Sequence, residues 1–264
     1  TEFYLDHPTI LAHQARPVHF AIRFTAETLS QPRAKPAAFC LVLDRSGSMA
    51  GAPLDKAKDA ARLAVRNLRA GDFFSLVVFD EDAQVMIPLQ DAKDRPAFLK
   101  RISQILDGGS TNLTGGWLLG RDELRKAPLN TTRRLLLLSD GQLNQGIIEP
   151  AEVRQVVVAG LEQDTVRTSC LGFGDNYNED LLAELARATN GQFHDASSPE
   201  KFPGIFAAEL EGLQKLCVQN LRVRIRALTF CDRYQPLGEY PVVALPDERK
   251  EFALGDLVSE EERI

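Results

Sequence analysis

Oxygen-bearing side chains that could bind a metal ion lie at three distant places in this 264-residue sequence. The first is the segment 44–48, with sequence DRSGS, and the others hold Thr111 and Asp140. The two serines of the segment are two residues apart, so both hydroxyls can point inward, and the glycine between them permits a tight backbone path. An all-oxygen set suits Mg²⁺ or Mn²⁺, and Ca²⁺ could also bind, whereas zinc prefers Cys and His. We therefore expect one metal site formed by Asp44, Ser46, Ser48, Thr111 and Asp140.

Two apolar segments are predicted to position the aspartates of this set. Residues 38–43 and 135–138 are almost continuously apolar, as expected of central strands buried on both faces of a sheet. Asp44 follows the first segment directly, and Asp140 follows the second after one serine. Ligands of open parallel sheets bind outside the carboxyl ends of the strands. The two aspartates should therefore meet at one edge of the sheet.

The sequence between residues 39 and 194 predicts a doubly wound, Rossmann-like α/β fold. Short apolar runs alternate there with amphipathic stretches, which is the pattern of βαβ units. The short gap between the predicted strands 73–79 and 85–89 fits a hairpin, which adds one antiparallel edge strand to a mostly parallel sheet of six strands. Helices are expected on both faces. The remaining predicted strands are 166–173 and 192–194, and the predicted helices are 53–68, 95–106, one around 117–124, 150–161, 179–189 and 198–216. Asn178 is expected to cap the helix 179–189.

The two ends of the chain have a different pattern. Residues 17–24 and 221–226 alternate between apolar and polar side chains with a period of two, as half-buried strands do. Such strands cannot bury one face alone. We expect residues 1–35 and 218–264 to pack together as a small β-sandwich-like unit, with the α/β domain of residues 36–217 inserted between them.

Composition excludes several classes of function. The net charge of −6 argues against a general nucleic-acid binder, which needs basic surface to displace counterions. The longest purely aliphatic run has four residues, 135–138, against the roughly 20 that a membrane helix needs. The four cysteines are widely spread, and Cys40 and Cys170 lie in apolar runs, which favours reduced thiols and a cytoplasmic location.

The metal segments also carry a resemblance to a known family. Residues 41–49, 109–113 and 137–141, supported by 77–80 and 171–174, resemble bacterial members of the von Willebrand factor A domain family, and the flanks are similar to those of inter-α-trypsin-inhibitor-like proteins. The resemblance covers about two thirds of the chain and implies an intact metal-ion-dependent adhesion site. It further implies that an Asp or Glu of a partner protein completes the coordination of the ion, in adhesion or complex assembly, and that the site catalyses no reaction.

Simpler roles compete for several of these polar residues. Asp80 is expected to be a turn residue rather than a group that supports the metal ligands. Asn112 and Asn144 are expected to cap helices rather than touch the site. Trp117 is expected to lie in the core, because large aromatic residues are mostly buried.

Two other functions fit part of the pattern. Some bacterial relatives suggest an intracellular adaptor for an AAA+ ATPase of the MoxR type. A phosphatase of the haloacid dehalogenase type would also place an Asp after a strand, as Asp44 is placed. Such enzymes need a second Asp two residues later as a general acid, and Ser46 occupies that position, where a neutral hydroxyl cannot perform this proton transfer.

Overall fold

The computed structural model of the chain describes residues 1–7, 17–26, 35–139, 145–173, 177–227, 231, 234–235, 237, 242–246, 248–258 and 261–263. The chain forms two compact units. One unit consists of Lys35–Gln214, and the other combines Thr1–Ala34 with Lys215–Ile264.

The first unit is built on a six-stranded sheet with the order β5-β4-β3-β6-β7-β8. Its strands pair in parallel except for the hairpin of β4 and β5 at one edge. The predicted α/β fold with one antiparallel edge strand is thereby confirmed. The strands are β3 (Ala37–Asp44), β4 (Phe73–Phe79), β5 (Ala83–Asp91), β6 (Thr132–Ser139), β7 (Arg167–Phe173) and β8 (Phe193–Ala196).

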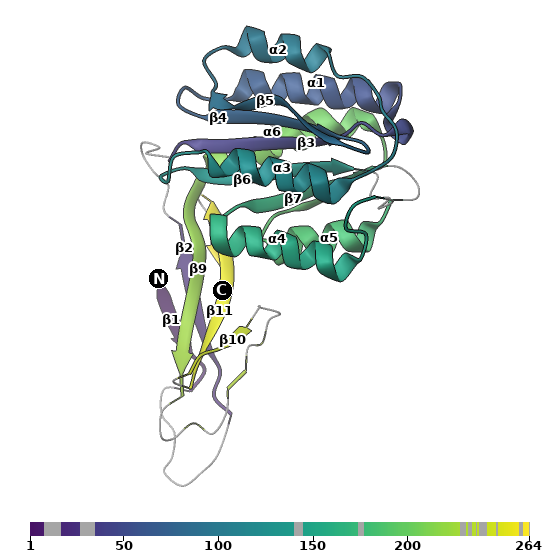
Figure 1. Cartoon of the computed structure of the whole chain (residues 1–264). Coiled ribbons are helices and arrows are strands. Elements are labelled where there is room, and N and C mark those ends of the chain that lie inside the picture. Colours follow the sequence, from purple (N-terminus) through teal and green to yellow (C-terminus); the bar gives the residue numbers. More distant parts are fainter. Residues whose placement is uncertain are drawn as a thin grey trace. The chain divides into compact units, whose positions relative to one another are not determined.

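Helices cover both faces of this sheet (Figure 1). One core cluster joins the sheet to α1 (Ala52–Asn67), α2 (Arg95–Ser103) and α6 (Phe202–Gln214). A second cluster joins it to α3 (Leu113–Arg125), α4 (Pro150–Asp164) and α5 (Glu179–Ala188). Two short 3₁₀ helices, η1 (Gly47–Met49) and η2 (Pro199–Lys201), precede α1 and α6.

The local sequence explains these elements. Every residue of β3 and β6 is buried, which accounts for the apolar runs 38–43 and 135–138 within them, although β6 begins with the polar residues Thr132, Arg133 and Arg134. The side chain of Asn178 accepts a hydrogen bond from the Leu181 N–H and caps α5, as the sequence predicts. Element ends differ by a few residues from the predictions. Helix α2 ends at Ser103 rather than at 106, and the segment after Ser198 first forms η2.

The second unit contains two antiparallel three-stranded sheets. In the sheet β1-β2-β12, the carboxyl-terminal strand pairs with an amino-terminal strand. In the sheet β10-β11-β9, Arg222 and Arg224 both bind the carboxylate of Glu251 and stay about half exposed, as expected of a solvated strand face. The strands are β1 (Glu2–Leu5), β2 (Phe20–Thr25), β9 (Leu216–Arg226), β10 (Val242–Ala244), β11 (Arg249–Val258) and β12 (Glu262–Arg263). No helix in the described part of the chain is long and apolar enough to span a membrane.

Candidate metal site

The carboxylate of Asp44 is fixed at the carboxyl end of β3. Asp44 is fully buried as the last residue of that strand. One carboxylate oxygen, Oδ1, accepts a hydrogen bond of 2.8 Å from the N–H of Ser46. The other, Oδ2, accepts one of 2.8 Å from the hydroxyl of Ser139, the last residue of β6. The ends of two core strands are thus joined at this carboxylate.

The two serine hydroxyls of the 44–48 loop converge, as the sequence predicts. The Oγ atoms of Ser46 and Ser48 lie 3.0 Å apart and share a hydrogen bond. Ser46 is buried, and Ser48 belongs to η1, which leads into α1. Two hydroxyl oxygens and a carboxylate therefore gather within five residues of chain.

The Gly-rich turn that carries Thr111 is bonded to this loop through the backbone. The N–H of Gly47 donates to the Gly109 carbonyl at 3.0 Å, and the N–H of Gly108 donates to the Arg45 carbonyl at 2.7 Å. Thr111 itself is buried in the turn. Of the five predicted ligands, Asp44, Ser46, Ser48 and Thr111 therefore lie in two adjoining loops. Asp140 lies outside the described residues, as does Asn144.

The chemistry of these donors fits a hard divalent cation. The groups in the two loops are carboxylate and hydroxyl oxygens, which Mg²⁺ and Ca²⁺ prefer. Within the described residues, no group of three or more His, Cys, Asp or Glu could hold a metal ion. Ser46, Ser48 and Thr111 do not count toward such a group, because their ligand atoms are hydroxyl oxygens. The oxygen atoms of these two loops are therefore the candidate ligands for a metal ion.

Asp80 connects three segments around the site. Its Oδ2 lies 2.8 Å from Nη2 of Arg45, and its Oδ1 accepts a hydrogen bond from the Asp82 N–H at 3.1 Å. Its backbone carbonyl accepts a hydrogen bond of 2.7 Å from the N–H of Asn112, beside Thr111. Asp80 is therefore the turn residue that the sequence predicts and, in addition, a support for both metal loops.

A signal for the Arg45–Asp80 pair was present in the sequence. Strands β3 and β4 pair with Asp44 opposite Phe79, so the next residue on each strand, Arg45 and Asp80, leaves the sheet at the same level. Their opposite charges could have indicated the contact, but the strand register that brings them together is set by the fold.

The glycine at position 108 is required by this contact. A Cβ atom on Gly108 would lie 1.9 Å from Oδ2 of Asp80 and 2.7 Å from its Cγ. Real Cβ contacts are never this short, so the backbone approaches Asp80 closely only because residue 108 has no side chain.

Comparison with known proteins identifies the family. Residues 39–208 match the von Willebrand factor type A domain. The chain belongs to this family.

Relatives of this A domain are distant and longer. An uncharacterized protein of Synechocystis sp. is 28% identical over 251 residues, which are 92% of the chain and 59% of that protein. Human inter-alpha-trypsin inhibitor heavy chain H3 is 27% identical over 168 residues, 59% of the chain and 18% of the inhibitor chain. The chain thus spans less than two thirds of the length of these relatives.

Solved structures share the fold of the A domain. A von Willebrand factor type A protein from Catenulispora acidiphila has a TM-score of 0.76 at 20% identity, covering 99% of this chain and 63% of that one. Proximal thread matrix protein 1 from the mussel byssus, solved with a zinc-occupied MIDAS motif, has a TM-score of 0.56 at 16% identity, covering 76% of this chain and 50% of that one. At these identities the likeness concerns the fold.

Asn112 and Trp117 support the A domain rather than form the site. The side chain of Asn112 accepts a hydrogen bond of 3.0 Å from the Gly115 N–H and caps α3, as predicted. Trp117 is fully buried, and its indole N–H donates to the Thr168 hydroxyl at 2.9 Å. Its predicted place in the core is confirmed.

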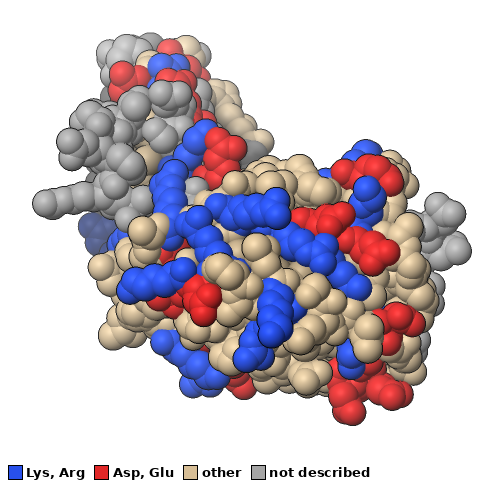
Figure 2. Space-filling model, turned by 90° about the horizontal axis from the view of Figure 1, so that it is seen from above, with Lys and Arg blue, Asp and Glu red and all other residues tan. Residues whose placement is uncertain are grey.

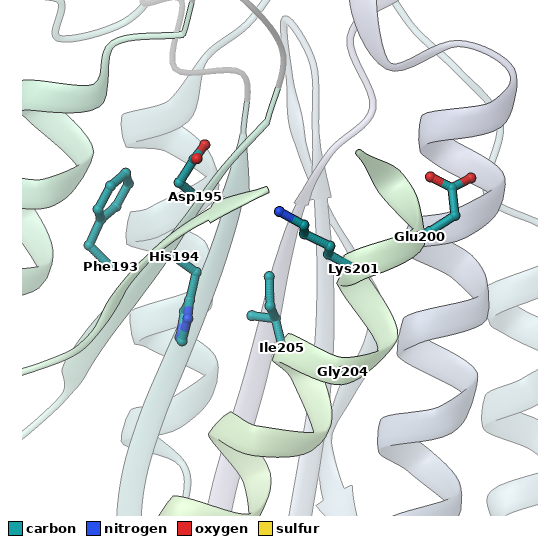
Figure 3. Close-up of a pocket in the computed structure, with 7 residues that line it drawn as sticks. All are labelled: Phe193, His194, Asp195, Glu200, Lys201, Gly204 and Ile205. Atoms are coloured by element: carbon teal, nitrogen blue, oxygen red, sulfur yellow. The ribbon is translucent and has the colours of Figure 1, made fainter. Parts of the chain in front are cut away.

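A hollow of about 550 Å³ lies between β8 and the start of α6 (Figure 3). Its wall includes Lys201, which points toward β8, and Asp195, whose carboxylate accepts a hydrogen bond of 2.8 Å from the Tyr177 hydroxyl. His194, also in the wall, has its Nε2 2.7 Å from Oε1 of the buried Glu209. None of the residues that line the hollow belongs to the 44–48 loop or to the turn of Thr111. The residues that line the hollow are thus different from those of the candidate metal site.

Proposed function

We propose that this chain is a Mg²⁺-dependent protein-binding module. Ser46, Ser48 and Thr111 bind the ion directly, and Asp44 and Asp140 bind it directly or through water. Support comes from the family, whose domains generally serve as binding modules rather than enzymes, and from the two adjoining loops described above. The single observation that carries the proposal is the convergence of the Ser46 and Ser48 hydroxyls beside the fixed carboxylate of Asp44.

The residues of the chain prepare the site in two ways. Two neutral donors, the Ser46 N–H and the Ser139 hydroxyl, set the orientation of the Asp44 carboxylate. Burial of Ser46 and Thr111 keeps bulk water away from the hydroxyls, which strengthens electrostatic attraction at the site. When bound, the ion supplies a positive centre that accepts a carboxylate oxygen from outside the chain.

The partner group that suits this site is the side chain of an Asp or Glu on another protein. Three of the five ligands are neutral hydroxyls, and the two aspartates only balance the charge of a divalent ion. A carboxylate from a partner is a hard oxygen ligand that completes an octahedral shell. No step of this binding requires a bond to be broken, so we propose a binding role and no catalytic one.

The substitution Asp44→Ala tests the proposal. We expect it to abolish the heat of Mg²⁺ binding in calorimetry. Circular dichroism checks that the fold persists, because Asp44 is buried at the end of β3 and its loss removes the acceptor of the Ser46 N–H and of the Ser139 hydroxyl. The matched control is Asp59→Ala, which removes an exposed acid of α1 and should leave Mg²⁺ binding unchanged. An unaltered Mg²⁺ titration of the Asp44→Ala variant would contradict the proposal.

A second experiment tests whether a carboxylate from outside the chain binds to the ion. Mn²⁺ bound at the site should relax water protons, and acetate, a minimal carboxylate, should lower that relaxation as it replaces metal-bound water. Crystals soaked in Mn²⁺ should show an anomalous peak between the 44–48 loop and the turn of Thr111. Relaxation that acetate does not change would indicate an ion with no exchangeable position for a partner.

A further inference from the structure

Positive charge is concentrated on two helices of an acidic chain. Residues 52–69 and 93–103, which contain α1 and α2, hold nine Lys and Arg against three Asp, a net charge of +6. The whole chain carries −6, so the rest carries −12. Figure 2 shows Lys and Arg spread over the face that these helices form, with most Asp and Glu toward one margin. Charge separation of this size produces a local positive field despite the negative total.

Much of this charge is not cancelled by acidic neighbours. Arg95 donates hydrogen bonds to the carbonyls of Arg66 and Leu68, and Arg101 donates to the carbonyl of Met86. Carbonyl groups are neutral, so both guanidinium groups keep their full charge while their positions are fixed. Within residues 35–139, all of which are described, Arg66 and Lys100 form no ion pair. Fixed cations of this kind lose little side-chain entropy when an anionic partner binds.

The same helices border the candidate metal site. Helix α1 begins three residues after η1, the 3₁₀ helix that contains Ser48. After α2 the chain reaches Gly108, whose N–H donates to the carbonyl of Arg45.

A protein–protein interface of standard size covers about 800 Å² of each partner, which corresponds to a circular patch of roughly 16 Å radius. Helix α1 is about 24 Å long, so a patch centred on the metal site reaches over the first part of this helix. The last turn of α2, with Lys100 and Arg101, leads toward Gly108, whereas α1 starts beside the site and carries Arg66 in its last turn. A protein held at the metal would therefore lie beside Lys100 and Arg101, and a partner that extends along α1 would also meet Arg62 and Arg66.

We propose that the α1/α2 basic face guides and holds an acidic surface of the same partner protein that supplies the carboxylate. This inference rests on the proposed function for the identity of the partner. The α1/α2 basic face is formed by Arg62, Arg66, Arg95, Lys100 and Arg101.

A protein surface fits this face better than a membrane or a nucleic acid. Asp55 and Asp59 stand among the cations on α1, where they pair with Lys58 and Arg62. A uniformly anionic lipid or phosphate surface would repel both aspartates, whereas a protein surface can oppose them with its own cations. No exposed large hydrophobic residue of the described chain lies on α1 or α2, so the face has no side chain that would insert into a bilayer.

The test uses a fluorescent poly-Glu peptide as the acidic probe. Neutralising three cations together, in the variant Arg62→Gln/Arg66→Gln/Lys100→Gln, should slow its association about tenfold at ~50 mM NaCl. The difference should fall below about twofold at ~500 mM NaCl, where screening is nearly complete. The variant Arg62→Lys/Arg66→Lys/Lys100→Arg keeps the charges and should behave like the original chain.

A matched control removes three cations elsewhere on the A domain. The variant Arg125→Gln/Arg154→Gln/Arg187→Gln changes the net charge equally but leaves the α1/α2 basic face intact, so association should slow less than twofold. Equal slowing by both triple variants would overturn the inference, because net charge alone would then explain it. Preferential binding to phosphatidylserine vesicles or to a DNA duplex over poly-Glu would overturn it as well.

Measurements with Mg²⁺ and with EDTA separate this inference from the proposed function. If the variant with neutralised cations binds poly-Glu more slowly but Mg²⁺ adds no affinity, the proposed metal function fails and the α1/α2 basic face remains a docking surface. If Mg²⁺ adds affinity but the variant with neutralised cations binds poly-Glu as fast as the charge-keeping variant, the proposed metal function stands and the inference fails.

Discussion

Buried charged groups at the amino ends of the strands in the central sheet are held differently from those at the carboxyl ends. At the amino ends of the strands, Arg134 lies 3.5 Å from the Glu209 carboxylate and 3.1 Å from the Ser169 hydroxyl. At the carboxyl ends, Asp44 accepts hydrogen bonds from two neutral donors, a backbone N–H and the Ser139 hydroxyl. The first arrangement satisfies a charge inside the protein. The second orients a carboxylate through neutral donors, which suits the binding of an external cation.

The network around Glu209 belongs to the first kind. This carboxylate on α6 is buried and meets His194 at 2.7 Å and the Ser169 hydroxyl at 2.8 Å, in addition to Arg134. It connects the last helix to three strands of the sheet. Its position away from the 44–48 loop makes it a reference for effects on stability that should leave metal binding unchanged.

The largest effect on stability is expected from Glu209→Ala. Removing this carboxylate leaves the buried Arg134 without its acidic partner, which should cost about 3–5 kcal/mol of unfolding free energy. Urea unfolding measures the loss, and Mg²⁺ affinity of the folded fraction should not change. A loss below about 1 kcal/mol would show that the network contributes little to stability. A changed Mg²⁺ affinity would show that the Glu209 network and the candidate metal site are coupled.

A smaller effect, with the opposite pattern, is expected from Asp80→Asn. The amide keeps the size of the side chain but removes the charge that Arg45 meets, so the two metal loops lose part of their support. Groups that orient metal ligands typically change affinity by about 10–100-fold, and we expect roughly tenfold weaker Mg²⁺ binding with about 1–2 kcal/mol lower stability. Asp91→Asn, which breaks the pair between the half-buried Asp91 and the exposed Lys93, is the control. Lower stability at full Mg²⁺ affinity would restrict Asp80 to a structural role.

The smallest effect is expected from mild acid. Burial alone raises the pKa of Glu209, but the hydrogen bond with His194 and the charge of Arg134 outweigh it, so the pKa lies below its ordinary value of 4.5. A carboxyl group with a lowered pKa in the folded state stabilises the protein above pH 4.5, and this contribution is lost as the pH falls through the folded pKa.

Unfolding free energy measured as the pH is lowered through and below 4.5 checks this direction. The Glu209→Gln variant cannot titrate at this position, so its stability should fall less steeply in acid than that of the original chain. An equally steep fall in both proteins would assign the acid sensitivity to other groups.

Much of the fold followed from local patterns in the sequence. The unbroken apolar runs of β3 and β6 predicted buried central strands, and Asn178 predicted the start of α5, because burial and helix capping act over a few residues. The ends of α2 and the split between η2 and α6 were missed by a few residues, since packing against neighbouring elements decides where a helix stops.

The sequence by itself determined which oxygen-bearing residues follow the core strands, because strand burial and loop chemistry are written in neighbouring residues. Only the tertiary structure decided that Arg45 meets Asp80, that Ser139 reaches Asp44, and that Glu209 joins His194 to Arg134. These contacts join residues 15 to 95 positions apart. No local pattern specifies them, because they depend on strand register and on how helices pack against the sheet.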